Sequence, residues 1–193
     1  RQWFTIQDGA LYVRTDKADG LDAIDATTGK LRWQSHEKFD APGLDDLPLV
    51  ADGIVYDHHG NHLYALDEKT GRRLWHQQIS ADRSFYPGRF YNGTFYIYSA
   101  LFRQQPTHPY EFQERVQAFA ARTGATLWTS PVGYKLLSDI PVTDGLIFTE
   151  RNYQGVSKIS ALNASSGNAR WQFTDSCSAC TTISAVVSGK ALY

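Results

Sequence analysis

The chain has 193 residues, of which 19 are basic and 20 acidic, and a formal net charge of −1 at pH 7. No basic stripe runs along it, which argues against nucleic acid as a partner. No segment approaches the roughly 20 apolar residues of a membrane-spanning helix, so no membrane span is expected.

In chain order, the first recurring signal is a turn dipeptide followed by a short hydrophobic strand. Aspartate or asparagine followed by glycine supplies the positive φ angles that a tight hairpin needs. Strands bounded by such turns, with no long helical pattern, predict an all-β chain. The four copies are Asp8-Gly9, Asp52-Gly53, Asn92-Gly93 and Asp144-Gly145, and a degenerate fifth is Ser188-Gly189.

A longer repeat, Ala-x-(Asp/Asn)-x-x-(Thr/Ser)-Gly-x-x-x-Trp, has the same period and starts at Ala23, Ala65, Ala118 and Ala161. The intervals from Trp33 to Trp75, Trp75 to Trp128 and Trp128 to Trp171 are 42, 53 and 43 residues. This is the length of one four-stranded propeller blade. The glycines and tryptophans that we interpret as structural are Gly29 and Trp33, Gly71 and Trp75, Gly124 and Trp128, and Gly167 and Trp171.

Each part of this repeat has a physical role. The Asp or Asn can accept a backbone N–H two residues on, and the Gly takes a left-handed conformation. The Trp is expected in the cleft between blades, where a large flat surface is buried and neighbouring blades complete each other's core. In the third copy Ala120 replaces the Asp or Asn, so that turn should be looser but not lost.

These motifs resemble the quinoprotein-type (pyrroloquinoline-quinone-like) β-propeller repeat over essentially the whole chain. The family includes quinone-dependent periplasmic dehydrogenases. It also includes scaffolds that bind no quinone, namely the outer-membrane assembly propeller lipoprotein and propellers attached to sensor kinases. The chain resembles the scaffolds more than the dehydrogenases. The repeat therefore implies the fold without implying the cofactor.

The resemblance implies a β-propeller of four-stranded antiparallel blades, with about four and a half blades in a ring of seven or eight. Blades are expected at residues 2–34, 46–77, 83–130 and 137–173, with the start of a fifth at 182–193. An open arc would expose unpaired strand edges. We therefore expect further blades or a second copy of the chain to close the ring.

Function in a propeller is expected where a blade departs from the repeat, in loops at one end of the channel. The largest departure is the hairpin of the third blade, residues 101–114. Aromatic and arginine side chains dominate binding interfaces, so this hairpin is a candidate binding surface. The alternative is a surface excursion packed by its own aromatics. The candidate binding residues are Phe102, Arg103, His108, Tyr110 and Phe112.

The only two cysteines, Cys177 and Cys180, lie in the connector that enters the fifth blade. A disulfide that closes this loop is the favoured interpretation, and reduced cysteines, a redox pair or half of a metal site remain alternatives. Redox chemistry favours such a pair at a helix N-terminus, and zinc would need two further ligands. A disulfide would favour an extracytoplasmic location, periplasmic or extracellular.

Three histidines occur within the segment Asp57-His58-His59-Gly60-Asn61-His62. Gly60-Asn61 is a good turn pair, so a solvated turn is favoured over a metal site, and we expect no metal centre.

Two functions from different classes remain. The favoured one is a non-catalytic scaffold that binds a protein, peptide or small ligand on its loop face and needs no cofactor. The alternative is part of a quinone-dependent periplasmic dehydrogenase, which would need a free stacking tryptophan, calcium ligands and a catalytic carboxylate. Four of the five tryptophans already occupy the repeat position.

Overall fold

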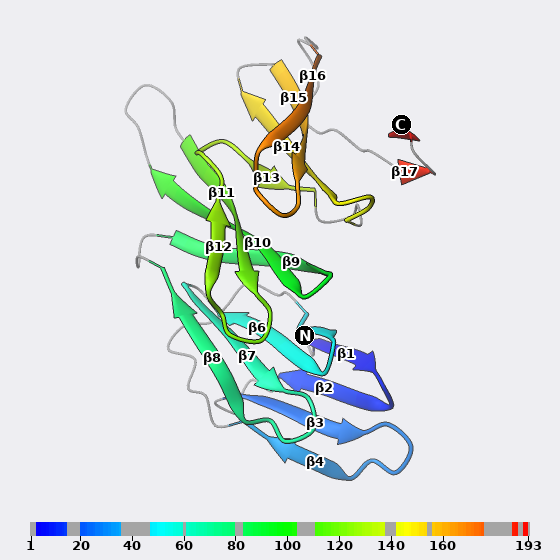
Figure 1. Ribbon diagram of the computed structural model, residues 1–193. Helices are drawn as coiled ribbons and strands as arrows, with labels where there is room; N and C mark the ends of the chain where they lie inside the picture. The colour runs from blue at the N-terminus through cyan, green and yellow to red at the C-terminus, as the bar shows by residue number, and fades with distance from the viewer. Residues whose placement is uncertain are drawn as a thin grey trace. The chain divides into compact units, whose positions relative to one another are not determined.

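The computed structural model of the chain is built from β-strands (Figure 1). It describes residues 3–14, 20–35, 47–59, 61–79, 83–103, 111–137, 142–153, 156–175, 187–188 and 191–192. No helix occurs in these segments, and thus none of them could cross a membrane as a long apolar helix.

The strands form four antiparallel four-stranded sheets, each made from four consecutive strands. The first holds β1 (Trp3–Gln7), β2 (Ala10–Arg14), β3 (Leu21–Asp25) and β4 (Leu31–Gln34). The second holds β5 (Leu49–Ala51), β6 (Ile54–His59), β7 (His62–Asp67) and β8 (Arg73–Gln78). The third holds β9 (Arg83–Tyr91), β10 (Thr94–Arg103), β11 (Glu111–Ala120) and β12 (Thr126–Thr129). The fourth holds β13 (Lys135–Leu136), β14 (Leu146–Tyr153), β15 (Val156–Asn163) and β16 (Ala169–Asp175).

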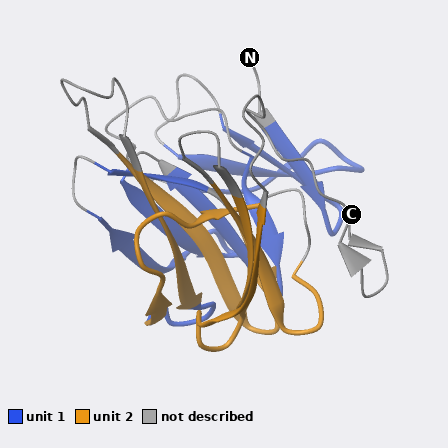
Figure 2. Ribbon diagram, turned by 90° about the horizontal axis from the view of Figure 1, so that it is seen from above, with its two compact units in different colours: residues 1–87, 120–125 blue, residues 88–119, 126–193 orange. Residues whose placement is uncertain are grey.

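A two-stranded ladder of β17 (Val187–Ser188) and β18 (Ala191–Leu192) follows the fourth sheet. The expected all-β partial propeller of antiparallel four-stranded blades is confirmed. The chain divides into two compact units, shown in different colours in Figure 2. The first comprises residues 1–87 and 120–125, and the second comprises residues 88–119 and 126–193.

The turn dipeptides adopt the backbone that their sequence predicts. Asp8 and Gly9 have φ angles of 47° and 71°, and the equivalent Asn92 and Gly93 have 46° and 72°. Two consecutive positive φ values join the first two strands of a sheet without splaying them, which is why Asp or Asn precedes Gly in every complete copy.

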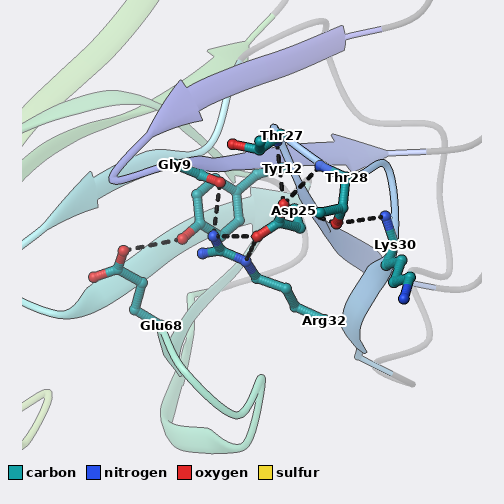
Figure 3. A network of polar contacts seen from close by, with 8 residues as sticks. All are labelled: Gly9, Tyr12, Asp25, Thr27, Thr28, Lys30, Arg32 and Glu68. Atoms are coloured by element: carbon teal, nitrogen blue, oxygen red, sulfur yellow. Dashed lines mark hydrogen bonds and ion pairs between the residues drawn. The ribbon is translucent and has the colours of Figure 1, made fainter.

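The turn between β3 and β4 shows the repeat chemistry in detail (Figure 3). Asp25 Oδ1 accepts hydrogen bonds from the backbone N–H groups of Thr27 and Thr28, at 3.1 and 2.8 Å. Its Oδ2 is bound by Arg32, whose guanidinium also donates to the Gly9 carbonyl at 2.7 Å. The Arg32 bond, reinforced by the Thr28 donors, holds the pKa of Asp25 well below its usual range. Arg32 therefore links the Asp25 carboxylate of the β3–β4 turn to the β1–β2 hairpin.

The third copy of this turn keeps its backbone bonds without the acidic side chain. The Gly124 N–H donates to the Ala120 carbonyl at 2.8 Å, the same distance as the Gly29 bond to Asp25. Ala120 offers no side-chain acceptor, so the turn is defined by its backbone bonds and by the Thr123 hydroxyl, which accepts from the Ala125 N–H at 3.3 Å.

Within the first unit, both tryptophans of the repeat motif, Trp33 and Trp75, lie over the glycine of the next repeat. A Cβ atom on Gly71 would lie 2.5 Å from Cε3 of Trp33, and one on Gly124 would lie 2.6 Å from Cδ2 of Trp75. The Trp33 indole donates to the Glu68 carbonyl at 2.7 Å. Only a residue without a side chain permits this approach.

The second unit repeats this contact with Trp128. Its ring lies over Gly167, where a Cβ atom would be 2.6 Å from Cε3, and its Nε1 donates to the Ala164 carbonyl at 2.9 Å. Trp171 occupies the same repeat position but is 38% exposed, whereas Trp33 is 7% exposed.

A small residue and a second aromatic accompany each tryptophan. Ala23 lies directly across the ladder from Trp33, is fully buried, and is followed by a register shift that turns the outer strand. Tyr12 packs against Trp33 with ring centroids 5.9 Å apart. The corresponding pairs are Tyr56 with Trp75, Tyr96 with Trp128, and Phe148 with Trp171.

Two local expectations differ from the structure. Leu101 to Arg103 and Glu111 to Glu114, expected within the variable hairpin, belong to the ends of β10 and β11. Asp57 and His58, expected in a solvated turn, are buried strand residues with 1% and 7% exposure. Arg14 makes the burial of Asp57 possible by supplying a compensating charge.

Candidate functional site

The sequence-derived binding residues are only partly within the described segments. Phe102 and Arg103 are the last residues of β10, and Phe112 is the second residue of β11. Their side chains lie outside the described residues. His108, Tyr110, Cys177 and Cys180 lie outside them entirely. The binding surface and the disulfide therefore stay predictions.

A cluster of charged side chains lies near the base of this hairpin, and we call Glu114, Lys135 and Glu150 the carboxylate–lysine cluster. Glu114 is the fourth residue of β11. Lys135 and Glu150 face each other across the β13–β14 ladder, with Nζ 3.0 Å from Oε1. Glu114 is thus the last residue of the candidate hairpin, residues 101–114.

The protonation of Glu114 is unusual. Burial raises its pKa to about 7, the positive charge of Lys135 opposes this shift, and the negative charge of Glu150 adds to it. Lys135 is already paired with Glu150, so it cannot fully stabilise a second carboxylate. Glu114 can therefore exchange a proton near neutral pH.

Backbone contacts hold the connector between β12 and β13 against this cluster. The Glu114 carbonyl accepts hydrogen bonds from the N–H groups of Gly133 and Tyr134, at 2.8 and 3.4 Å. Gly133 has a φ of 97°, and a Cβ atom there would lie 3.0 Å from Cζ of Arg151. The Arg151 guanidinium thus packs against the glycine, which places a second cation beside the connector.

One further polar contact extends this surface. Gln172 Nε2 donates to the Tyr134 hydroxyl at 3.2 Å. The surface offers donors, acceptors and charges of both signs. This composition suits recognition of a polar backbone or a mixed-charge partner.

In the first unit, Arg14 and Asp57 form an ion pair between neighbouring sheets. Arg14 Nε donates to Asp57 Oδ2 at 3.2 Å, and Nη2 donates to the His58 carbonyl at 3.0 Å. The Asp57 side chain is fully buried and that of Arg14 is 18% exposed. The sequence gives no signal for this pair because the two residues come from different repeats and are not repeat positions.

Three of the described indoles make structural contacts. Trp33, Trp75 and Trp128 each donate Nε1–H to a carbonyl of the next repeat's turn and cover its glycine. The glycine-covered face of each of these three rings is therefore not available to a planar quinone, whereas Trp171 is 38% exposed. Among the described residues, no group of three or more His, Cys, Asp or Glu side chains lies together in a metal-binding arrangement.

Comparison with solved structures gives the same fold. The model matches BamB from Moraxella catarrhalis with a TM-score of 0.59 and 16% identity, covering 90% of this chain and 51% of that one. It matches the quinohemoprotein alcohol dehydrogenase of Comamonas testosteroni with a TM-score of 0.63 and 15% identity, covering 91% of this chain and 35% of that one. At these identities the likeness shows the propeller fold alone.

A curated relative gives a sequence match. A tetrathionate hydrolase of Acidithiobacillus ferrooxidans is 28% identical over 135 residues, which cover 61% of this chain and 24% of that protein. This chain therefore spans about half of the solved BamB and a smaller share of the two enzymes.

The family model described as outer membrane protein assembly factor BamB matches residues 3–85 and 113–191, and between them lies the lengthened β10–β11 hairpin. The matched segments make up most of the sequence and contain all four copies of the tryptophan repeat. The chain belongs to this family of pyrroloquinoline-quinone-like propeller proteins.

Proposed function

We propose that this chain is part of a non-catalytic, extracytoplasmic propeller that binds a protein or peptide through the end of its sheets carrying the β10–β11 hairpin. The observation that carries the proposal is a gap in the family match. The match ends at residue 85 and resumes at residue 113, so the segment between these residues departs from the common repeat.

The chemistry beside this segment supports a binding role. The carboxylate–lysine cluster, Arg151 and the anchored connector surround the start of β11 with charges of both signs. Aromatic and arginine residues in the hairpin would supply apolar contacts, while the cluster would fix orientation. Both the family description and the solved BamB concern an assembly factor, which agrees with a protein partner.

Site-specific photo-crosslinking in cells tests the proposal. A photoreactive phenylalanine at position 110 should give a discrete adduct with a protein partner, identified by mass spectrometry. The matched control is position 165, an exposed residue of the β15–β16 turn. A second probe at position 135 should also give an adduct with the partner. Deleting residues 103–111 should leave folding nearly intact, because shortening a hairpin has a small entropic cost. The same deletion should abolish the adduct from position 135. No adduct at 110, or equal adducts at 110 and 165, would contradict the proposal.

An enzymatic role is the second candidate, and Glu114 is the observation that favours it. A carboxyl group with a pKa of about 7 is suited to general acid–base catalysis at neutral pH. Two similar proteins are enzymes by name, a quinohemoprotein alcohol dehydrogenase and a tetrathionate hydrolase. Titration with pyrroloquinoline quinone and calcium tests this role. A saturable, stoichiometric change in absorbance, together with reduction of a dye, would favour the dehydrogenase over the scaffold.

A further inference from the structure

Two imidazole rings in the second sheet point nitrogen to nitrogen. His62 begins β7, and His76 lies on the neighbouring strand β8, opposite Tyr64. His62 Nδ1 and His76 Nε2 are 2.8 Å apart, the ring centroids are 5.1 Å apart and the ring planes differ by 9°. The rings are thus nearly coplanar, and one shared proton lies between them.

Gln78 lies beside the other nitrogen of His62. Nε2 is 3.4 Å from the side-chain amide nitrogen of Gln78. The amide nitrogen can donate to Nε2, and a flipped amide can instead accept from an Nε2–H, so both tautomers of His62 are compatible with this contact. With Nε2 protonated, Nδ1 carries the lone pair that faces His76. A metal-binding histidine characteristically has such an outer partner for its second nitrogen.

The His76 ring is also supported by packing. The Tyr64 ring stacks on His76 with centroids 4.6 Å apart and an interplanar angle of 14°, and Tyr64 is itself only 6% exposed. His62 and His76 lie at the exposed end of this stack. The two imidazole rings are therefore accessible to solvent, and the buried Tyr64 ring supports His76.

The spacing suits one metal ion in place of the shared proton. Two imidazole nitrogens bound tetrahedrally to zinc at about 2.0–2.1 Å lie about 3.3 Å apart. The nitrogens therefore need to separate by about half an ångström, and both rings need to turn so that their lone pairs converge on the ion. Imidazole nitrogen suits zinc, nickel and copper, whereas magnesium prefers oxygen ligands.

We propose that His62 Nδ1 and His76 Nε2 form a surface site for a divalent transition-metal ion such as Zn²⁺. Binding displaces the shared proton to solvent, and water completes the coordination. The site links β7 to β8 in the second sheet and is separate from the carboxylate–lysine cluster. Because protons and metal compete for the same nitrogens, affinity falls as the solution is acidified.

The test measures Zn²⁺ binding to the full chain by competition with a chromophoric chelator. The wild type should bind Zn²⁺ with one-to-one stoichiometry and should not respond to Mg²⁺. His62→Gln and His76→Gln should each weaken Zn²⁺ binding at least tenfold. The control His108→Gln removes a histidine from another segment and should leave the affinity unchanged.

A measurement on the wild-type protein keeps the test valid if a variant fails to fold. In long-range ¹H–¹⁵N NMR spectra of the imidazoles, Zn²⁺ should shift His62 Nδ1 and His76 Nε2 most strongly. Absence of saturable Zn²⁺ binding, unchanged affinity in either Gln variant, or a dominant shift at His62 Nε2 would overturn the proposal.

Discussion

Trp33 and Gly71 belong to different sheets, yet the indole lies so close to the glycine that a Cβ atom there would be 2.5 Å from Cε3 of the ring. Gly29 occupies the same repeat position in the first sheet and has the same φ of 68°, but a Cβ atom on it would meet nothing within 4 Å. The two glycines thus separate the effect of backbone conformation from the effect of packing.

Substituting these two glycines should therefore give different losses of stability. Gly29→Ala should cost about 1–2 kcal/mol, since only the left-handed backbone is strained. Gly71→Ala should cost about 1–3 kcal/mol more, because the methyl group displaces the Trp33 ring. Urea unfolding followed by tryptophan fluorescence measures both. Equal losses would show that packing on Gly71 contributes nothing.

The Arg14–Asp57 ion pair should contribute far more than an exposed pair. Arg14→Met leaves a fully buried carboxylate without its cation, so the free energy of unfolding should fall by about 3 kcal/mol. The control is Arg122→Met in the Arg122–Asp52 pair, where the side chains are 68% and 50% exposed, and its effect should stay below about 1 kcal/mol. Chemical denaturation compares the two variants, and a similar loss in both would contradict the prediction. The double variant Arg14→Met with Asp57→Leu should recover part of the loss.

Glu114 should make the folded state less stable as the pH rises toward neutrality. Its pKa is about 7 in the folded state, above its ordinary value of 4.5, so the folded protein binds this proton more tightly than the unfolded chain. The stabilisation is fully present below about pH 4.5 and is lost as the pH rises through about 7. After allowance for partial exposure and the Lys135 charge, the loss between pH 5 and 8 should be about 1–2 kcal/mol.

Glu114→Gln should remove this dependence, because glutamine resembles the protonated carboxyl group at every pH. Unfolding free energies at pH 5, 6, 7 and 8 for both proteins test it. The pKa values of Asp25 and Asp67 are lowered below their ordinary 3.8, so their contributions change at more acidic pH. A slope that persists in the Gln variant would assign the effect to another group.

The repeat made the fold predictable, whereas contacts between different repeats were not. The fold follows from a motif that places Ala23, Gly29 and Trp33 at fixed offsets, and local turn chemistry decides each offset. Arg14 and Asp57 are 43 positions apart in the chain, at sites where the other repeats carry different residues. His76 reaches His62 only through the β7–β8 register.

The candidate site was predictable only as a departure from the repeat. Periodicity located the hairpin that contains Phe102, Arg103, His108, Tyr110 and Phe112, and their role in binding stays a prediction. The carboxylate–lysine cluster escaped prediction because Glu114 acquires its raised pKa from burial and from the negative charge of Glu150 on β14. No local pattern around residue 114 specifies that environment.

Each repeat contains both a tryptophan and a glycine turn, and these contact different neighbouring repeats. Trp75 contacts Gly124 of the following repeat, whereas Gly71 contacts Trp33 of the preceding repeat. A gene segment that encodes one whole repeat therefore carries both halves of the junction in the correct order. Duplicating or losing such a segment would leave every remaining junction with a matching partner. The number of blades in such proteins can thus change during evolution in whole-repeat steps, whereas a single substitution at one glycine disrupts a junction at once.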